Sequence, residues 1–202
     1  MHAGVPKGTP VFYFARLSRP AIFIDGGYLN KVLEQFGRTR IDYGKFSNLL
    51  AAGSELLRTY YYHCMPYRSA PPTPEEEALY ASMRQFVDYL QKTPRLEVRL
   101  GRLAKRDKQC RQCRHEWTEF EQKRVDVLFA VDLTRLAASR QIGRCVLVTS
   151  DSDFVPAIQA AKNDGVLVQL YYSRGLSYND ELLQACDDRI EITPDLINAA
   201  RR

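Results

Sequence analysis

The chain has 202 residues, an apolar fraction of 45% and a formal net charge of +5 at pH 7. This length and composition are ample for one packed domain. The five cysteines are an odd number scattered among apolar segments, which argues against a disulfide framework and favours a reducing, cytoplasmic setting. No apolar run approaches the roughly 20 residues of a membrane span, so we expect no membrane association.

The first 20 residues differ from the rest of the chain. They contain proline, glycine and basic residues around one short apolar patch at 11–14, which is too short for the apolar region of a secretory signal. We expect residues 1–20 to be a flexible lead-in and residues 21–202 to form a single domain.

An apolar run at 21–24 is typical of a strand that is buried on both faces, and it ends in an acid, Asp25. Gly26 and Gly27 allow the backbone to turn tightly beside this acid, before a helix that is expected over residues 28–36. The third glycine of a dinucleotide-binding fingerprint is absent, and no Walker A sequence occurs.

The next strand is expected over residues 56–64 and contains three consecutive tyrosines at 60–62. The tyrosine rings are expected to pack in the core. Alternatively, one of them stacks on a nucleic-acid base. The proline-rich residues 65–74 that follow form either a lid at the edge where the acids lie or a simple connection.

Thr73 has the pattern of a helix cap, because proline and then acidic residues follow it. The helix is expected to end near Lys92. Its predicted buried stripe consists of Leu79, Met83, Phe86, Val87 and Leu90.

The segment at 95–124 is different in character. Residues 95–103 alternate between apolar and charged side chains, which predicts a half-exposed strand, and a basic insertion with one tryptophan follows at about 104–120. A dense basic group beside an exposed tryptophan suits a phosphate backbone with a base stacked next to it, although a solubilising loop has the same composition. The predicted nucleic-acid-binding residues are Lys105, Arg106, Lys108, Arg111, Arg114, Trp117, Lys123 and Arg124.

Cys110 and Cys113, with His115 two residues later, resemble half of a zinc knuckle. A structural zinc site needs four ligands, and a second pair is not evident in the sequence. Zinc bound by these three residues is therefore a secondary hypothesis.

Residues 121–139 read as a long helix that is apolar almost all round from Val125, which predicts deep burial. An ionised carboxylate in such surroundings needs a partner or a metal. Asp126, near the helix start, is better placed to reach a cleft at the strand ends, whereas Asp132 could pair with Arg135 or another basic group.

The stretch at 144–156 carries the strongest signal. A buried-strand run at 145–148 stops abruptly in polar residues, and a helical pattern resumes at Phe154, so Asp151 and Asp153 lie where a strand passes into a helix. In open α/β sheets, ligands bind at that edge. One of these two acids could simply cap the helix. A helix needs only one cap, so capping does not explain the second acid.

The remaining elements are simpler. They are predicted as a helix at 42–52, a strand at 166–172, a helix near 178–186, a short strand at 189–192 and a C-terminal helix.

Four acids, Asp25, Asp126, Asp151 and Asp153, thus come from two strand ends and one helix. Carboxylates brought close together cannot all stay ionised without a cation. The natural occupant is Mg²⁺ or Mn²⁺, which orients a phosphate and activates water. Metal-assisted phosphodiester hydrolysis follows from this chemistry.

Three blocks carry a family resemblance. F-I-D-G-G-Y-L at 23–29, K-R-V-D-V-L-F-A-V-D-L at 123–133 and T-S-D-S-D-F-V-P-A-I at 149–158 resemble, in this order, the signature blocks of the NYN domain family, the LabA-like branch of the PIN-like nucleases. The resemblance covers about residues 21–192. It implies a Rossmann-like, three-layer α/β/α sandwich with a central, mainly parallel sheet.

The resemblance also implies a Mg²⁺- or Mn²⁺-dependent ribonuclease site. By position, Asp25, Asp126 and Asp151 match the core acids of the family, and Asp153 matches an additional acid of the same cluster. Many relatives have Asn where this chain has Tyr28. The candidate site therefore also includes the nearby Asn30, together with Ser150 beside Asp151.

The sequence is compatible with three functions. The leading hypothesis is a metal-dependent endoribonuclease that grips RNA phosphates with the basic segment. The alternative is a non-catalytic RNA-binding or adaptor module that retains the fold. A phosphatase that uses Asp25 as nucleophile is disfavoured, because Gly27 stands where that chemistry usually needs a second acid. The oligomeric state is left open.

Overall fold

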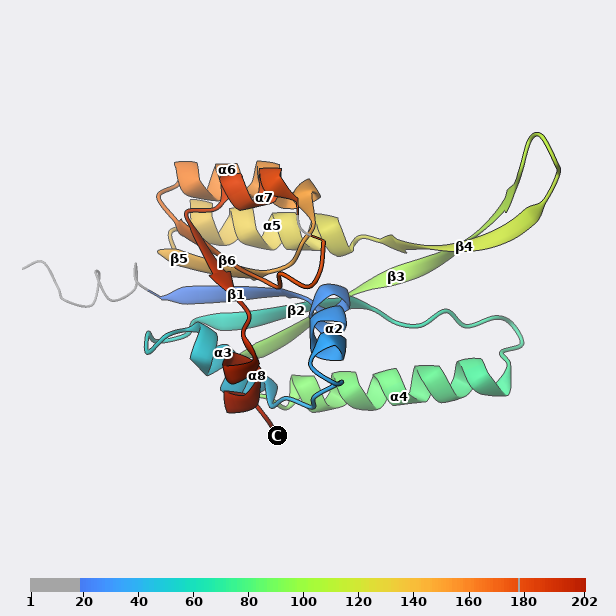
Figure 1. The fold of residues 1–202 in the computed structure, drawn as a ribbon, viewed down its shortest axis with the longest axis horizontal. Coiled ribbons are helices and arrows are strands. Elements are labelled where there is room, and N and C mark those ends of the chain that lie inside the picture. The colour runs from blue at the N-terminus through green and yellow to red at the C-terminus, as the bar shows by residue number, and fades with distance from the viewer. Residues whose placement is uncertain (1–18, 178) are drawn as a thin grey trace, which may run out of the picture.

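The computed structural model describes residues 19–177 and 179–202, and its centre is one seven-stranded sheet (Figure 1). The strand order is β4-β3-β2-β1-β5-β6-β7, and every neighbouring pair is parallel except β3 and β4. The strands are β1 (Pro20–Asp25), β2 (Arg58–Cys64), β3 (Leu96–Gln109), β4 (Glu116–Lys123), β5 (Arg144–Val148), β6 (Leu167–Tyr172) and β7 (Asp188–Glu191).

Helices cover both faces of the sheet (Figure 1), which confirms the predicted three-layer α/β/α sandwich. One face packs against α2 (Gly26–Gln35), α3 (Tyr43–Leu50), α4 (Pro74–Gln91) and α8 (Pro194–Ala199). The other face packs against α5 (Val125–Ala138), the 3-10 turn η1 (Ser152–Phe154), α6 (Val155–Asn163) and α7 (Asp180–Ala185). Within the described residues, no helix is both long and apolar enough to cross a membrane.

The predicted lead-in lies outside the described residues, apart from Arg19 and Pro20. Pro20 is already the first residue of β1. Residue 178, which we expected to begin a helix, is also outside the described residues, and α7 begins at Asp180.

The three consecutive tyrosines of β2 are all buried, so the core-packing alternative is confirmed and base stacking by one of them is wrong. Alternation along the strand sends Tyr60 and Tyr62 into the core beneath α5, and Tyr61 into the core on the opposite face. The rings of Phe23 and Tyr62 lie nearly parallel, with centroids 6.3 Å apart.

Helix α4 begins as predicted, with a capping box in which Thr73 and Glu76 bond to each other's backbone N–H. Its predicted buried stripe is wrong in the first half. Val87 and Leu90 are buried, but Leu79 is 61% exposed. The reason is that the first turns of α4 project beyond the strands that cover its second half (Figure 1).

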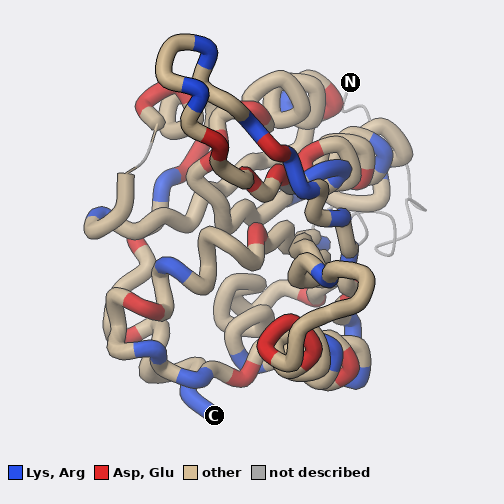
Figure 2. The backbone as a smooth tube through the Cα atoms, turned by 90° about the vertical axis from the view of Figure 1, so that its right-hand side faces the viewer, with Lys and Arg blue, Asp and Glu red and all other residues tan. Residues whose placement is uncertain are grey.

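The basic segment forms an ordered hairpin. Strand β3 does not end near residue 103 but continues to Gln109, and it pairs with β4 from Arg102 opposite Lys123 to Gln109 opposite Glu116. We call residues 102–124 the arm, because this hairpin projects beyond the sheet (Figure 1). Figure 2 shows basic and acidic residues interspersed along it, and their attraction across the hairpin supports the pairing.

Helix α5 differs from its prediction in two ways. It begins at Val125 and not at 121, because residues 121–123 belong to β4. Deep burial all round is also wrong, since Val127 and Val131 are 65% and 53% exposed. These two side chains lie one turn apart on a face that no other described element covers.

Candidate functional site

The strand order reverses between β1 and β5. The chain passes from β1 to β2 and β3 on one side, and β5 lies on the other side of β1, with Ile24 paired to Val148. Asp25 is the last residue of β1, and Asp151 follows β5 after a two-residue turn. The two acids therefore flank the topological switch point, where open α/β sheets bind ligands.

Asp25 is held by the helix that follows it. One carboxylate oxygen, Oδ1, accepts hydrogen bonds from the backbone N–H groups of Gly27 at 2.8 Å and Tyr28 at 3.1 Å. The side chain thus caps α2 and has a fixed direction. Its second oxygen accepts no hydrogen bond from any residue that the structure describes, so it remains free for a ligand.

Gly26 allows this turn to lie against the neighbouring strand. A β-carbon on residue 26 would lie 2.5 Å from the hydroxyl oxygen of Tyr61. Only glycine permits so close an approach. The Tyr61 ring therefore forms the floor of the turn after Asp25, through a contact between β2 and the first residue of α2 that the local sequence does not reveal.

Tyr28 is buried and points toward the end of β6. Its hydroxyl accepts a hydrogen bond from the backbone N–H of Ser173 at 2.9 Å. Tyr28 therefore ties α2 to the loop after β6, at the same edge of the sheet as the acids.

Asp151 has a capping role of its own. Its Oδ1 accepts a hydrogen bond from the backbone N–H of Asp153 at 2.9 Å, so it caps the 3-10 turn that leads into α6. Asp153 is exposed in that turn. The simple capping alternative is thus correct for one oxygen of Asp151, and the other oxygen has no hydrogen-bond partner among the described residues.

Asp126 lies in the first turn of α5, directly after the arm. This position depends on Gly101 of β3, because a β-carbon there would lie 2.6 Å from the carbonyl oxygen of Lys123 and from Val125. Asp126 is exposed, whereas the sequence suggested apolar surroundings. The helix begins at the edge of the sheet, where solvent reaches its first turn.

The four acids converge electrostatically. Partial burial raises the pKa of the Asp126 carboxyl, and the negative charges of Asp151, Asp25 and Asp153 raise it further. Burial also raises the pKa of Asp25, and so does the charge of Asp151, against the lowering effect of the hydrogen bonds from Tyr28 and Gly27. Residues about 100 positions apart in the chain thus lie close enough for their charges to interact.

Two residues beside the cluster were missed by sequence reasoning. The positive charge of Lys31, on α2, lowers the pKa of Asp25 and is the basic group at this site. Cys64, the last residue of β2, is buried, which raises the pKa of its thiol, and the charges of Asp126 and Asp25 act in the same direction. Lys31 is near Asp25 because α2 follows that residue directly, whereas the pairing of β1 with β2 brings Cys64 to the acids.

The donor chemistry fits a hard divalent cation, because all four side chains offer carboxylate oxygens. Within the described residues, no three His, Cys, Asp or Glu side chains are arranged so that they could hold one metal ion together. Mg²⁺ usually binds through one or two carboxylates and keeps several waters. The free oxygens of Asp25 and Asp151 suit this mode of binding.

Other predicted site residues lie outside the cluster. Asp132 lies on the buried face of α5, where its Oδ2 accepts hydrogen bonds from Arg99 Nε at 2.8 Å and from the Tyr62 hydroxyl at 3.1 Å. Its role is structural, as the basic-partner alternative suggested. Asn30 is on the exposed side of α2, and Ser150 is half-buried in the turn before Asp151.

The half zinc knuckle forms the turn of the arm. The backbone N–H of Arg114 donates to the carbonyl of Cys110 at 2.9 Å, and hydrogen bonds from Cys113 and Gln112 lower the pKa of the Cys110 thiol. His115 is directed elsewhere, since its ring lies parallel to that of Trp117. The structure therefore brings together two of the three proposed zinc ligands.

The comparisons agree with this architecture. A protein of unknown function from Vibrio parahaemolyticus has a similar crystal structure, with a TM-score of 0.58 and 20% sequence identity over 89% of this chain and 96% of that chain. None of the curated proteins matches this chain. The model of the NYN domain matches residues 19–193, which include all four acids, and the chain therefore belongs to the NYN domain family.

Proposed function

We propose that this chain is a metal-dependent endoribonuclease, in which Asp25, Asp126, Asp151 and Asp153 hold Mg²⁺ or Mn²⁺ and RNA is the substrate. The observation that carries the proposal is the convergence of the four carboxylates at the switch point of the sheet, where each of the other three raises the pKa of Asp126. Repulsion of this kind is relieved by a bound cation. Membership of the NYN family supports a nuclease.

A bound Mg²⁺ or Mn²⁺ would orient a phosphate, activate water and stabilise charge on the leaving oxygen. The chain's own residues prepare the site for this chemistry. The caps of α2 and η1 fix the carboxylates of Asp25 and Asp151, so that little ordering is needed when substrate arrives. Lys31 adds a positive charge beside Asp25 for an approaching phosphate.

The test is cleavage of a labelled single-stranded RNA with Mn²⁺ or Mg²⁺, stopped by a chelator. The cleavage rate should fall by roughly 100-fold or more in each of Asp25→Asn, Asp126→Asn and Asp151→Asn. Loss of a group that only orients a metal ligand costs roughly 10- to 100-fold, and loss of the ligand itself should cost more. Asp132→Asn is the matched control on the same helix as Asp126. Full activity of both Asp25→Asn and Asp151→Asn would refute the site.

One observation favours the alternative, a non-catalytic RNA-binding module. No three potential ligands among the described residues are positioned around a common point. That function predicts RNA binding that weakens with salt and no metal-dependent turnover by the wild-type protein. The same cleavage assay therefore separates the two functions.

A further inference from the structure

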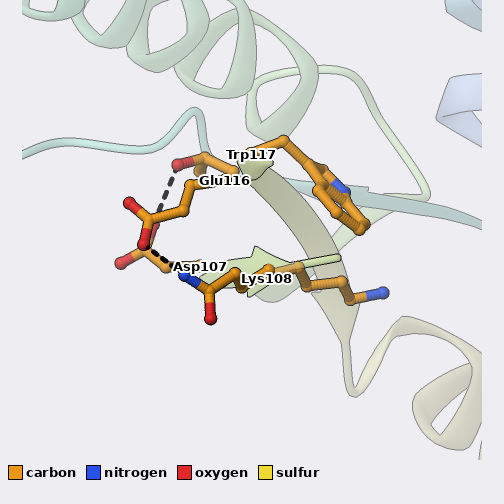
Figure 3. A pocket seen from close by; sticks show the side chains of 6 residues that line it. Asp107, Lys108, Glu116 and Trp117 are labelled. Atoms are coloured by element: carbon orange, nitrogen blue, oxygen red, sulfur yellow. Dashed lines mark hydrogen bonds between the residues drawn. The ribbon is translucent and has the colours of Figure 1, made fainter. Parts of the chain in front are cut away.

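The arm has two different faces. In its register, Trp117 lies opposite Lys108, whereas Phe120 lies opposite Lys105. Because side chains alternate along a strand and directly paired residues share a face, Trp117 and Lys108 lie on one face and Phe120 and Lys105 on the other. Figure 3 shows the indole of Trp117 and the ammonium of Lys108 on the same side of the hairpin, and Asp107 and Glu116 on the opposite side.

The face that carries Phe120 contacts the proline-rich loop that precedes α4. The Phe120 ring contacts the ring of Tyr67, with centroids 5.0 Å apart. Hydrogen bonds from Ser69 and Thr73 lower the pKa of Glu76 at the start of α4, and the nearby charge of Lys105 lowers it further. The proline-rich loop thus contacts the Phe120 face, although Phe120 itself is 52% exposed, and the Trp117 face is open to solvent as well.

The Trp117 face presents two parallel rings. Trp117 is 40% exposed. The His115 ring lies nearly parallel to it, at an interplanar angle of 16° and a centroid distance of 6.2 Å. Glu119 forms an ion pair with Lys108, and a hydrogen bond from the indole N–H of Trp117 also lowers the pKa of Glu119. Glu119 therefore links Lys108 to Trp117 on this face of the arm.

The arm also carries most of the excess charge of the chain. Residues 102–124 contain eight Lys and Arg against four Asp and Glu, a net +4 of the total +5. Some of these basic side chains form ion pairs, as Arg106 does with Glu121 at 3.4 Å. Such exposed pairs are weak, so a phosphate can replace the glutamate at little cost. Four arginines form no ion pair with any described residue, namely Arg102, Arg111, Arg114 and Arg124.

The stacked rings are remote from the acid cluster. Trp117 and Lys123 are six positions apart on β4, about 20 Å of strand. Asp126 begins the cluster only three residues later. A ligand that reaches both places must be extended, and the net positive charge of the arm favours a polyanion.

We propose that the arm binds an unpaired stretch of RNA, with one base stacked on Trp117 and His115, phosphates held by the arm's arginines, and several nucleotides between the stacked base and the acid cluster. Unpaired bases offer their faces to aromatic rings, whereas the base faces of a duplex are covered by neighbouring pairs. The RNA is therefore single-stranded where it contacts the arm. The link to cleavage rests on the proposed function, but binding by the arm does not.

Trp117 is the only tryptophan in the chain, so its fluorescence reports on this site alone. The full-length protein is titrated in EDTA with a labelled single-stranded RNA of roughly 12 nucleotides, within the usual range of single-strand sites. As RNA is added, the tryptophan fluorescence should fall in parallel with the rise in anisotropy of the RNA label. A duplex of the same sequence should quench less. Saturating anisotropy with unchanged tryptophan fluorescence would overturn the proposal.

Substitutions separate stacking from charge. Trp117→Ala should weaken single-strand binding roughly 5- to 150-fold, the range for one stacked base, and Trp117→Phe should recover most of the affinity. Equal binding by Trp117→Ala and the wild type would contradict the proposal. In cleavage assays, the ratio of wild-type to Trp117→Ala rates should grow from a dinucleotide to the longer RNA, and a ratio independent of length would also overturn it. Absence of any cleavage by the wild type would instead count against the proposed function, and the fluorescence result would stand.

Discussion

Asp25 and Asp151 stand at the carboxyl ends of neighbouring parallel strands, and the negative charge of Asp151 raises the pKa of the Asp25 carboxyl. Each residue also caps the helical turn that follows it. The two roles can be separated, because capping needs an oxygen acceptor whereas cation binding needs a charge.

The first prediction separates these roles at residue 25. Asparagine is as good a cap as aspartate, so Asp25→Asn should keep the free energy of unfolding within about 0.5 kcal/mol of wild type or raise it, whereas Asp25→Ala should lower it by about 1 kcal/mol. Both variants should lose metal-dependent cleavage. Chemical denaturation and an RNA cleavage assay check this, and an active Asp25→Asn variant would leave Asp25 with a capping role alone.

The second prediction contrasts two aspartates on α5. Asp132 is buried with Arg99 and Tyr62 as partners, so Asp132→Asn should lower the free energy of unfolding by about 1.5–3 kcal/mol, the value of hydrogen bonds to charged groups. Asp126→Asn should be neutral or stabilising, because it relieves repulsion from the other acids. Urea denaturation of both variants measures the difference. A large loss of stability in Asp126→Asn would show that its charge has a structural partner.

The third prediction concerns pH. The pKa values of Asp25 and Asp126 are raised above 3.8 in the folded protein, so the folded state holds these protons more tightly than the unfolded chain. Without metal, their contribution to stability is therefore most favourable at low pH, and it falls as the pH rises from 3.8 through the raised values. Measured in EDTA, the stability gained by Asp126→Asn over wild type should grow across this window. A difference that does not change with pH would contradict the repulsion.

The fourth prediction concerns the floor of the site. Gly26→Ala should lower the free energy of unfolding by about 1–3 kcal/mol, because its β-carbon would overlap the Tyr61 ring and displace the turn that holds Asp25. Gly27→Ala is the matched control, since its β-carbon would meet its nearest neighbour, Asp25 Oδ1, only at 3.3 Å. Thermal unfolding of both variants provides the comparison, and equal losses would show that backbone freedom, and not the contact with Tyr61, requires the glycine.

The sequence predicted the strands that carry the acids, because buried runs that end in Asp25 or lead into Asp151 have a clear local pattern. Their meeting was predicted from the parallel order of such strands. The floor formed by Tyr61 and the close packing at Gly101 could not be predicted, since both contacts join separate strands or helices and leave no periodic signal.

The arm and α5 show a different limit. The charges of β3 and β4 resemble those of a solvated loop, and only their pairing across the hairpin stabilises strands there. An apolar helix likewise does not reveal which side remains uncovered, so the exposure of Val127 and Val131 could not be predicted. Local patterns identify buried surfaces well, but they do not decide what lies opposite them.

The most direct test of the central claim is Mn²⁺ binding, followed by electron paramagnetic resonance of the free ion, in the wild type and in Asp25→Asn, Asp126→Asn and Asp151→Asn, with Asp132→Asn as control. If the acids form one cation site, each of the three substitutions should weaken Mn²⁺ binding, by roughly tenfold or more, and the control should bind as the wild type does. Undiminished binding in all three variants would contradict the account.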